Sequence, residues 1–121
     1  MDEIAITLLY IKNQLQIYHW TTSSFSRHKG SDQLIDSLTL LIDKFMETMI
    51  GIEGKRFSLK KKSKIILNNE TDSSIIKVLK YSRSWLSDDL PKYIKNDTDL
   101  TNIRDEMLAE INKTLYLFTL E

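Results

Sequence analysis

Hydrophobic residues recur every three or four positions along most of the chain, a period typical of amphipathic helices. A first helix is predicted from about Asp2, as its N-cap, to about Thr21. Its apolar residues fall into two stripes. One holds Ile4, Leu8, Ile11, Leu15 and His19, and the other holds Ile6, Leu9, Tyr10, Ile17 and Trp20. Because a helix that is apolar on two sides needs two partners, we expect it to pack inside its own subunit and against something else.

The second helix also has two distinct sides. Its core stripe is predicted to hold Leu34, Leu38, Leu41, Ile42, Phe45 and Met49. The opposite side is acidic with two apolar positions, and holds Asp32, Asp36, Leu40, Asp43, Glu47 and Ile50. The start of this helix stays open. An early start capped by Ser23 or Ser24 adds Phe25 and His28 to the outer stripe, whereas a cap at Ser31 leaves His28 in a loop.

Two further helices are expected in the second half of the chain. The third begins near residues 71–73 and is ended or kinked by Pro91, with a break near residues 87–89, and the fourth is capped by Asp99. A connection of about twenty residues separates the second helix from the third, and its length is unusual for a loop. Residues 65–67, which are Ile, Ile and Leu, are expected to pin it to the core. The sequence therefore predicts a single all-α domain over residues 1–121, a four-helix bundle with one long crossover, with an up-and-down bundle as the open alternative.

Composition narrows the classes of partner. The 17 basic and 17 acidic residues cancel, so no global field attracts nucleic acid or an anionic membrane. The chain has no cysteine, which excludes disulfides and thiolate sites. It starts without the positive flank of a signal peptide and has no apolar run long enough to span a membrane, so we expect a soluble, cytoplasmic protein.

The crossover is the most basic part of the chain. Its cations are Lys55, Arg56, Lys60, Lys61, Lys62 and Lys64. A solvated loop is the favoured interpretation, because only Phe57 is interleaved for stacking on a base. Contact with nucleic acid or phosphate through these six residues is the less favoured alternative.

Four residues in the first two helices carry ligands for a metal: His19, His28, Asp43 and Glu47. Neutral imidazole and carboxylate together suit Fe(II), Zn or Mn. Each residue also has an ordinary structural interpretation. His19 could be a satisfied histidine at a helix end, His28 a surface histidine in a loop, and the acidic pair part of a solvated helix face.

Spacing along the helices predicts that one chain cannot assemble this site. In an antiparallel hairpin that turns near residue 26, His19 lies level with residue 33, and His28 lies fifteen residues from Asp43, or about 22 Å along a helix. Two copies change this. If two such helices cross antiparallel near Asp36, His28 of one lies opposite the turn from Asp43 to Glu47 of the other. A twofold dimer with two equivalent sites follows.

These residues resemble a known family. The order His19-Trp20, Phe25, His28, Asp43 and Glu47 is similar to the ferroxidase signature of the DNA-protecting proteins of starved cells, the Dps branch of the ferritin-like superfamily. The resemblance implies a ferritin-like fold, a homo-oligomer of at least two subunits, and iron held between twofold-related subunits by those two histidines and two carboxylates. It also implies oxidation of Fe(II) as a candidate activity.

Two stretches resemble a second group. The run YHWTTSSFSRHKGSDQLIDSLTLLIDKF and the ending EINKTLYLFTLE are similar to an uncharacterised ferritin-like family of large DNA viruses. This resemblance implies an alternative function, in which the chain is a non-enzymatic structural or interaction protein of a viral particle. Such a protein would keep the fold, contact other viral structural proteins, and lie in the virion or the host cytoplasm.

Overall fold

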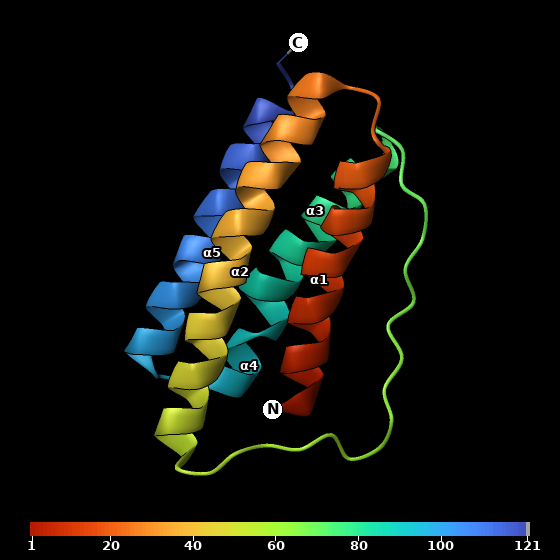
Figure 1. The fold of residues 1–121 in the computed structure, drawn as a ribbon. Helices are drawn as coiled ribbons and strands as arrows, with labels where there is room; N and C mark the ends of the chain where they lie inside the picture. Colours follow the sequence, from red (N-terminus) through yellow and green to blue (C-terminus); the bar gives the residue numbers. More distant parts are fainter. Residues whose placement is uncertain (121) are drawn as a thin grey trace.

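The computed structural model describes residues 1–120, and within that range it contains helices and connections but no strand. Figure 1 shows the arrangement. The elements are α1 (Asp2–Thr21), α2 (Phe25–Glu53), α3 (Ser74–Ser84), the π-helical turn η1 (Trp85–Asp89), α4 (Pro91–Ile94) and α5 (Thr98–Leu117). The predicted all-α class is confirmed.

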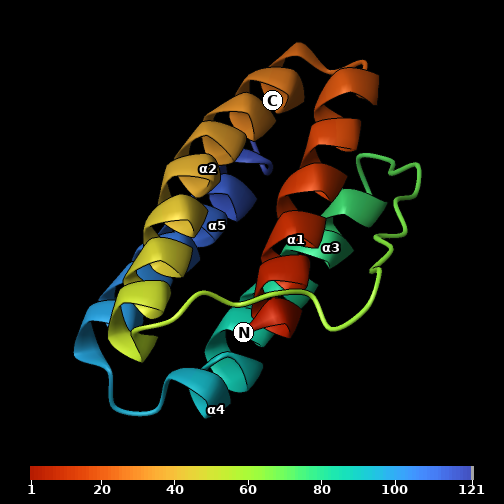
Figure 2. The same cartoon turned by 60° about the horizontal axis from the view of Figure 1, so that its bottom comes forward.

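Four helices form a ring in which neighbours are antiparallel. α1 packs against α2 and α3, and α5 packs against the same two helices. α1 and α5 run in one direction and α2 and α3 in the other (Figure 1). Because α2 and α3 are parallel, the connection between them, residues 54–73, has to travel the whole length of the bundle. We call this connection the crossover. It crosses the end of the bundle beside the N-terminus and then follows the α1 and α3 side (Figure 2).

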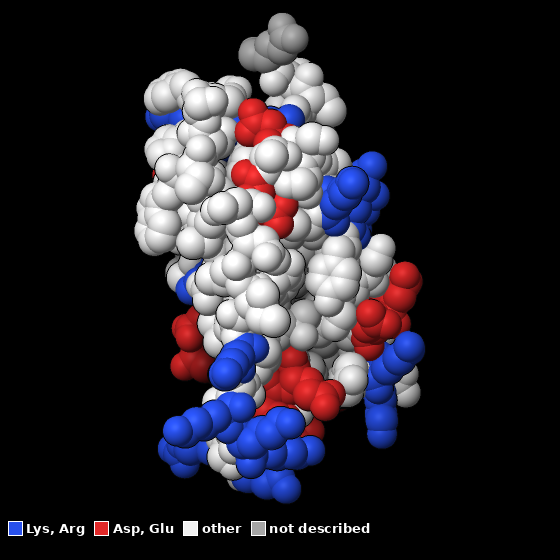
Figure 3. All heavy atoms as spheres, turned by 90° about the vertical axis from the view of Figure 1, so that its right-hand side faces the viewer, with Lys and Arg blue, Asp and Glu red and all other residues white. Residues whose placement is uncertain are grey.

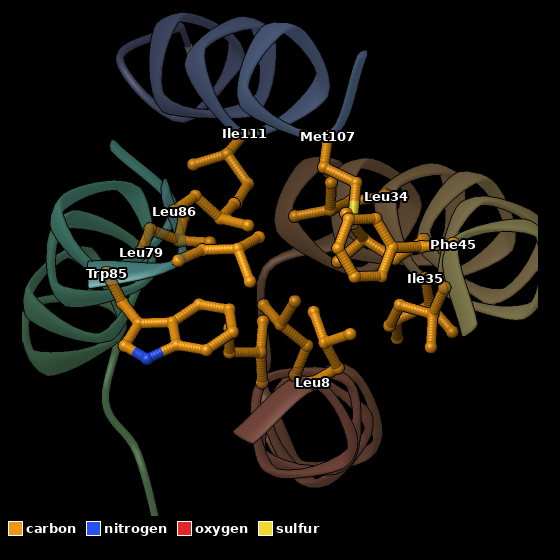
Figure 4. Packing of buried hydrophobic residues seen from close by; sticks show 14 of the residues in the cluster. Leu8, Leu34, Ile35, Phe45, Leu79, Trp85, Leu86, Met107 and Ile111 are labelled. Atoms are coloured by element: carbon orange, nitrogen blue, oxygen red, sulfur yellow. The ribbon is translucent and has the colours of Figure 1, made fainter. Parts of the chain in front are cut away.

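The core lies along the axis of the ring, where side chains from all four helices meet (Figure 4). Leu8 of α1, Phe45 of α2, Leu79 of α3 and Ile111 of α5 are each 1% exposed or less. The predicted core stripes of the first two helices are buried, apart from Leu41, which is half-buried. Spacing of three and four residues thus places one side of each helix against the axis.

The early start of α2 is correct, and the alternative cap at Ser31 is not. The Ser24 hydroxyl oxygen accepts a hydrogen bond from the Arg27 amide at 3.2 Å and satisfies one of the free N–H groups of the first turn. His28 therefore lies on the helix rather than in a loop. α2 then continues unbroken to Gly54, whose φ of 74° ends it in the left-handed conformation that glycine adopts without strain.

Helix boundaries in the second half differ slightly from those predicted. The break expected near residues 87–89 is a π-helical turn, in which the Leu90 amide donates to the Trp85 carbonyl at 2.9 Å. Pro91 follows after Leu90, and a widened turn relieves the clash that a proline ring makes with the preceding turn of a helix. Asp97, not Asp99, is the N-cap of α5.

A buried glutamine anchors the crossover to α1, and of the expected run at residues 65–67 only Ile65 is half-buried against that helix. The Gln14 side chain is fully buried. Its Nε2 donates to the Asn68 carbonyl at 2.6 Å, and the Asn68 amide donates to its Oε1 at 3.1 Å. Ile66 is 76% exposed and cannot serve as an anchor. The contact between Gln14 and Asn68 stabilises the crossover because one side-chain amide satisfies both backbone groups of a residue that lies outside any helix.

The second apolar stripe of α1 is split between two environments. Ile6 and Tyr10 lie beside the crossover, where they line a small pocket with Ile65 and Tyr81. The rings of Tyr10 and Tyr81 meet edge to face with centroids 6.3 Å apart. Part of the surface that was expected to need an outside partner is therefore covered by the chain itself. Only Leu9 and Trp20 of that stripe remain exposed.

Candidate metal site on the outer side of helices α1 and α2

The two histidines lie against each other at the closed end of the α1 and α2 hairpin. His19 belongs to the last turn of α1, and His28 to the first turns of α2. Their imidazole rings stack with centroids 3.9 Å apart and planes 17° from parallel. His19 is buried and His28 is exposed. The three-residue turn between the helices is what brings residues nine positions apart into contact.

Each histidine is held by the backbone of the other. Nδ1 of His19 bonds to the His28 carbonyl at 2.9 Å, and Nδ1 of His28 bonds to the His19 carbonyl, also at 2.9 Å. Carbonyl oxygens only accept, so both Nδ1 atoms carry the proton and both Nε2 atoms keep a lone pair in the neutral rings. The buried Ser31 hydroxyl also donates to the His28 carbonyl at 3.1 Å. This is the tautomer, and the kind of backbone support, that metal-binding histidines have.

The sequence reasoning missed a third residue near this pair. Oδ1 of Asp32 lies 3.8 Å from Nε2 of His19, with the Asp32 side chain 58% exposed. Asp32 follows His28 by four positions, and residues at that spacing share one side of a helix. The four-residue spacing from His28 could therefore have predicted that Asp32 lies near the histidines.

Asp43 and Glu47 lie further along the same helix, with both side chains exposed. A hydrogen bond shared with the Asp43 carboxylate, together with the negative charge of that group, raises the pKa of Glu47. Two carboxylates at this separation repel when both are ionised, and a bound cation would relieve that repulsion. The pair is therefore a chemically suitable half of a metal site.

Within one chain the two halves stay apart. α2 is continuous from His28 to Asp43, which keeps the predicted offset of about 22 Å. Among residues 1–120, no three His, Cys, Asp or Glu side chains gather where they could hold a metal ion. A site of three or four ligands at this position would need residues from a second chain.

The outer apolar residues of α2 do not all lie on one side. Leu40 is 74% exposed and lines a groove with Leu41 and residues of α5, away from α1. Ile50 lies instead beside Glu47, near the start of the crossover. Phe25 and Trp20, at the hairpin end, are 73% and 69% exposed. The histidine end of the hairpin thus carries its own exposed aromatic surface.

The six cations of the crossover form a distinct surface at the opposite end of the bundle. Figure 3 shows lysine and arginine side chains gathered at the lower end of the side that the crossover covers. Residues 55–64, which we call the basic segment, contain no helix, and all are exposed except Phe57. In the part of the chain that the structure describes, none of the charged nitrogens of these side chains lies within 4.0 Å of a carboxylate.

Residues 19–118 match a family of unknown function, DUF5856. The chain belongs to this family. It is also similar to an uncharacterised 14.6 kDa protein encoded in the mobD–ri intergenic region of Enterobacteria phage T4. The two are 27% identical over 120 residues, which cover 99% of this chain and 88% of that protein. No solved structure matches.

The matched range begins at His19 and includes His28, the acidic pair and the crossover. The family description assigns no activity to any of them. The phage relative is consistent with the alternative expectation of a viral protein, and it says nothing about a role in a viral particle. No helix within residues 1–120 has the length and hydropathy needed to cross a bilayer.

Proposed function

We propose that this chain is a ferritin-like protein of the Dps type that binds iron at a twofold interface between two copies. His19 and His28 of one copy and Asp43 and Glu47 of the other would be the ligands. The proposal rests chiefly on one observation: the two imidazoles hold each other through their Nδ1 atoms and leave both Nε2 atoms as acceptors.

The topology supports the ferritin-like assignment. A four-helix bundle with a single long crossover between parallel helices is the arrangement of ferritin-like folds. Here the crossover joins α2 to α3, and the neighbouring helices in the ring are antiparallel. An ordinary up-and-down bundle would join α2 to α3 by a short turn instead.

The position of the ligands on α2 supports the twofold arrangement. The helix is unbroken, and the midpoint between His28 and the Asp43 to Glu47 turn falls near Asp36, in the middle of its outer side. Two antiparallel copies crossing there bring each histidine pair to an acidic pair. The crossover covers the α1 and α3 side, so it leaves this side of α1 and α2 free.

The donor set fits iron. Imidazole nitrogen and carboxylate oxygen together suit Fe(II), and carboxylates favour the ion as it is oxidised. Bound there with open coordination positions, iron would supply reaction with oxygen, and oxidation of Fe(II) is the candidate activity. The role of the chain itself is to hold neutral imidazoles in the correct tautomer and two carboxylates one helical turn apart.

Anaerobic titration with Fe(II), followed by addition of oxygen and measurement of absorbance, tests the proposal. We expect two equivalent sites per dimer. His28→Ala and Asp43→Asn should each abolish binding, while Asp88→Asn, an exposed carboxylate on η1, should leave it unchanged. No binding at micromolar iron by an intact dimer would refute the proposal.

A second function has its own support. The phage relative and the exposed aromatic residues Trp20 and Phe25 favour a metal-free helical protein that contacts other subunits of a viral particle. This alternative predicts that the double variant His28→Ala, Asp43→Asn keeps both its oligomeric state and its incorporation into particles. The iron-binding proposal predicts loss of metal from the same variant.

A further inference from the structure

The zero net charge of the chain hides a strong separation of charge between opposite sides. Residues 55–84, which comprise the crossover without Gly54 and all of α3, contain nine basic and two acidic residues. α2 and α5 together contain nine acidic and five basic residues. α3 and the crossover lie on one side of the ring, and α2 and α5 form the other (Figure 1). The molecule therefore has a basic side and an acidic side.

The acidic side contains a groove between α2 and α5. Leu40 and Leu41 from α2 and Ala109 from α5 give it an apolar floor, with Glu106 and Glu110 at its edge. Leu40 is 74% exposed there, which is unusual for a leucine in the middle of a long helix. Glu110 has one cation of its own side within reach, Lys113 at 3.4 Å. Glu106 has none within 4.0 Å among residues 1–120.

The basic segment matches this groove in both charge and hydrophobicity. The charged nitrogens of its six cations have no carboxylate within 4.0 Å among residues 1–120, and the backbone amide of Lys60 donates to the Asp2 carboxylate at 3.5 Å. Leu59, in the middle of the segment, is 47% exposed. None of the segment is helical, so it can present its side chains to a partner without first having to unfold. An apolar residue flanked by lysines suits an apolar floor flanked by glutamates.

We propose that the basic segment of one copy docks in the groove between α2 and α5 of another copy. The two surfaces lie on opposite sides of the bundle, so the contact is heterologous, and each copy can give its segment to one neighbour and receive a segment from another. Repetition produces a closed ring or an open chain. The groove adjoins the outer side of α2, since Leu40 lies one turn from Asp36, but the contact uses neither histidine and does not depend on iron.

Charge reversal with mixing tests this directly. One variant carries Lys61→Glu and Lys62→Glu, and the other carries Glu106→Lys and Glu110→Lys. Alone, each variant sets like charges against like, so association measured by sedimentation should weaken at least about tenfold from wild type. Mixed in equal amounts, each variant offers the other a complementary surface, and association should return to near the wild-type level.

Two controls locate the effect. Lys77→Glu with Lys80→Glu makes the same change in net charge on α3, outside the segment, and should leave association within about twofold of wild type. Association of the wild type should also weaken as salt rises from about 0.05 M to 0.5 M, because the charges lie at an exposed interface.

Several results would overturn the proposal. These are a wild-type protein that shows no salt-sensitive association, a charge-reversed variant that associates normally, and a mixture that fails to recover. If wild type does not self-associate but binds a single-stranded oligonucleotide through Lys61 and Lys62, the partner is nucleic acid and the proposal is wrong. Iron binding by the Glu106→Lys, Glu110→Lys variant should be unchanged, so failure here is distinct from failure of the iron site.

Discussion

Replacing Gln14 should loosen the crossover around Asn68 without unfolding the bundle, while the bond between Tyr18 and Asp72 still holds its end. The Gln14 amide makes two hydrogen bonds with the backbone of Asn68, one as donor and one as acceptor. Gln14→Leu keeps a buried side chain of similar size but removes both bonds, together with a third and longer one from Nε2 to the Glu70 carboxylate at 3.3 Å. Leucine suits the buried position, and Asn68 is exposed, so water can satisfy its backbone groups once the crossover moves away.

The size of the effect follows from those two bonds. Each contributes about 0.5–1.5 kcal/mol net, so opening of the crossover near Asn68 should become easier by about 1–3 kcal/mol. This corresponds to roughly a 5- to 150-fold rise in the opening equilibrium. The free energy of global unfolding should change much less, because the core along the axis of the ring is untouched and leucine adds apolar burial.

Amide hydrogen exchange measured by NMR reports the opening of the crossover at a single residue, Asn68. In the wild type the Asn68 amide is protected by its bond to Gln14, and in the Gln14→Leu variant its exchange should accelerate by the factor above. Gln16→Leu is the matched control, because Gln16 is on the same helix and makes no side-chain hydrogen bond to the crossover. Equal Asn68 protection in both variants and in the wild type would show that Gln14 does not anchor the crossover.

Three further predictions concern acid stability, the core and the metal. The hydrogen bond from Tyr18, at 2.6 Å, holds the pKa of Asp72 below its usual 3.8. That contribution to stability is present above about pH 4 and is lost as the pH falls through the lowered value, so Asp72→Asn should flatten the fall in unfolding free energy between about pH 5 and 2 in urea titrations. Phe45→Ala should cost about 3–5 kcal/mol in the same assay, because a fully buried ring leaves a cavity where all four helices meet; a loss below about 1 kcal/mol would mean that the core collapses to fill it. If the iron proposal holds, chelation should weaken the twofold dimer in sedimentation experiments, because the ion would no longer join the histidines of one copy to Asp43 and Glu47 of the other; a dimer of equal strength without metal would contradict this.

Local pattern alone determined much of this molecule. The period of apolar residues identified the four helices, the end of α1 and the buried stripes, because burial of one side of a helix depends only on spacing of three and four residues. It placed the start of α1 one residue late, since the N-cap is Met1 and not the predicted Asp2. It also showed that His28 and Asp43 are too far apart to act within one chain, since the rise of a helix is constant. It could not choose between Ser24 and Ser31 as the cap of α2, because both offer the same hydroxyl to the backbone.

Only the tertiary structure decided which residues from different elements meet. The stacking of His19 on His28 and the approach of Asp32 depend on the exact path of a three-residue turn, which no periodicity encodes. The anchor at Gln14 joins residues 54 positions apart. In the sequence, a glutamine that will be buried cannot be distinguished from an exposed one until its partner is known. The separation of charge into two sides follows from the order of helices around the ring, so it is invisible in a net charge of zero.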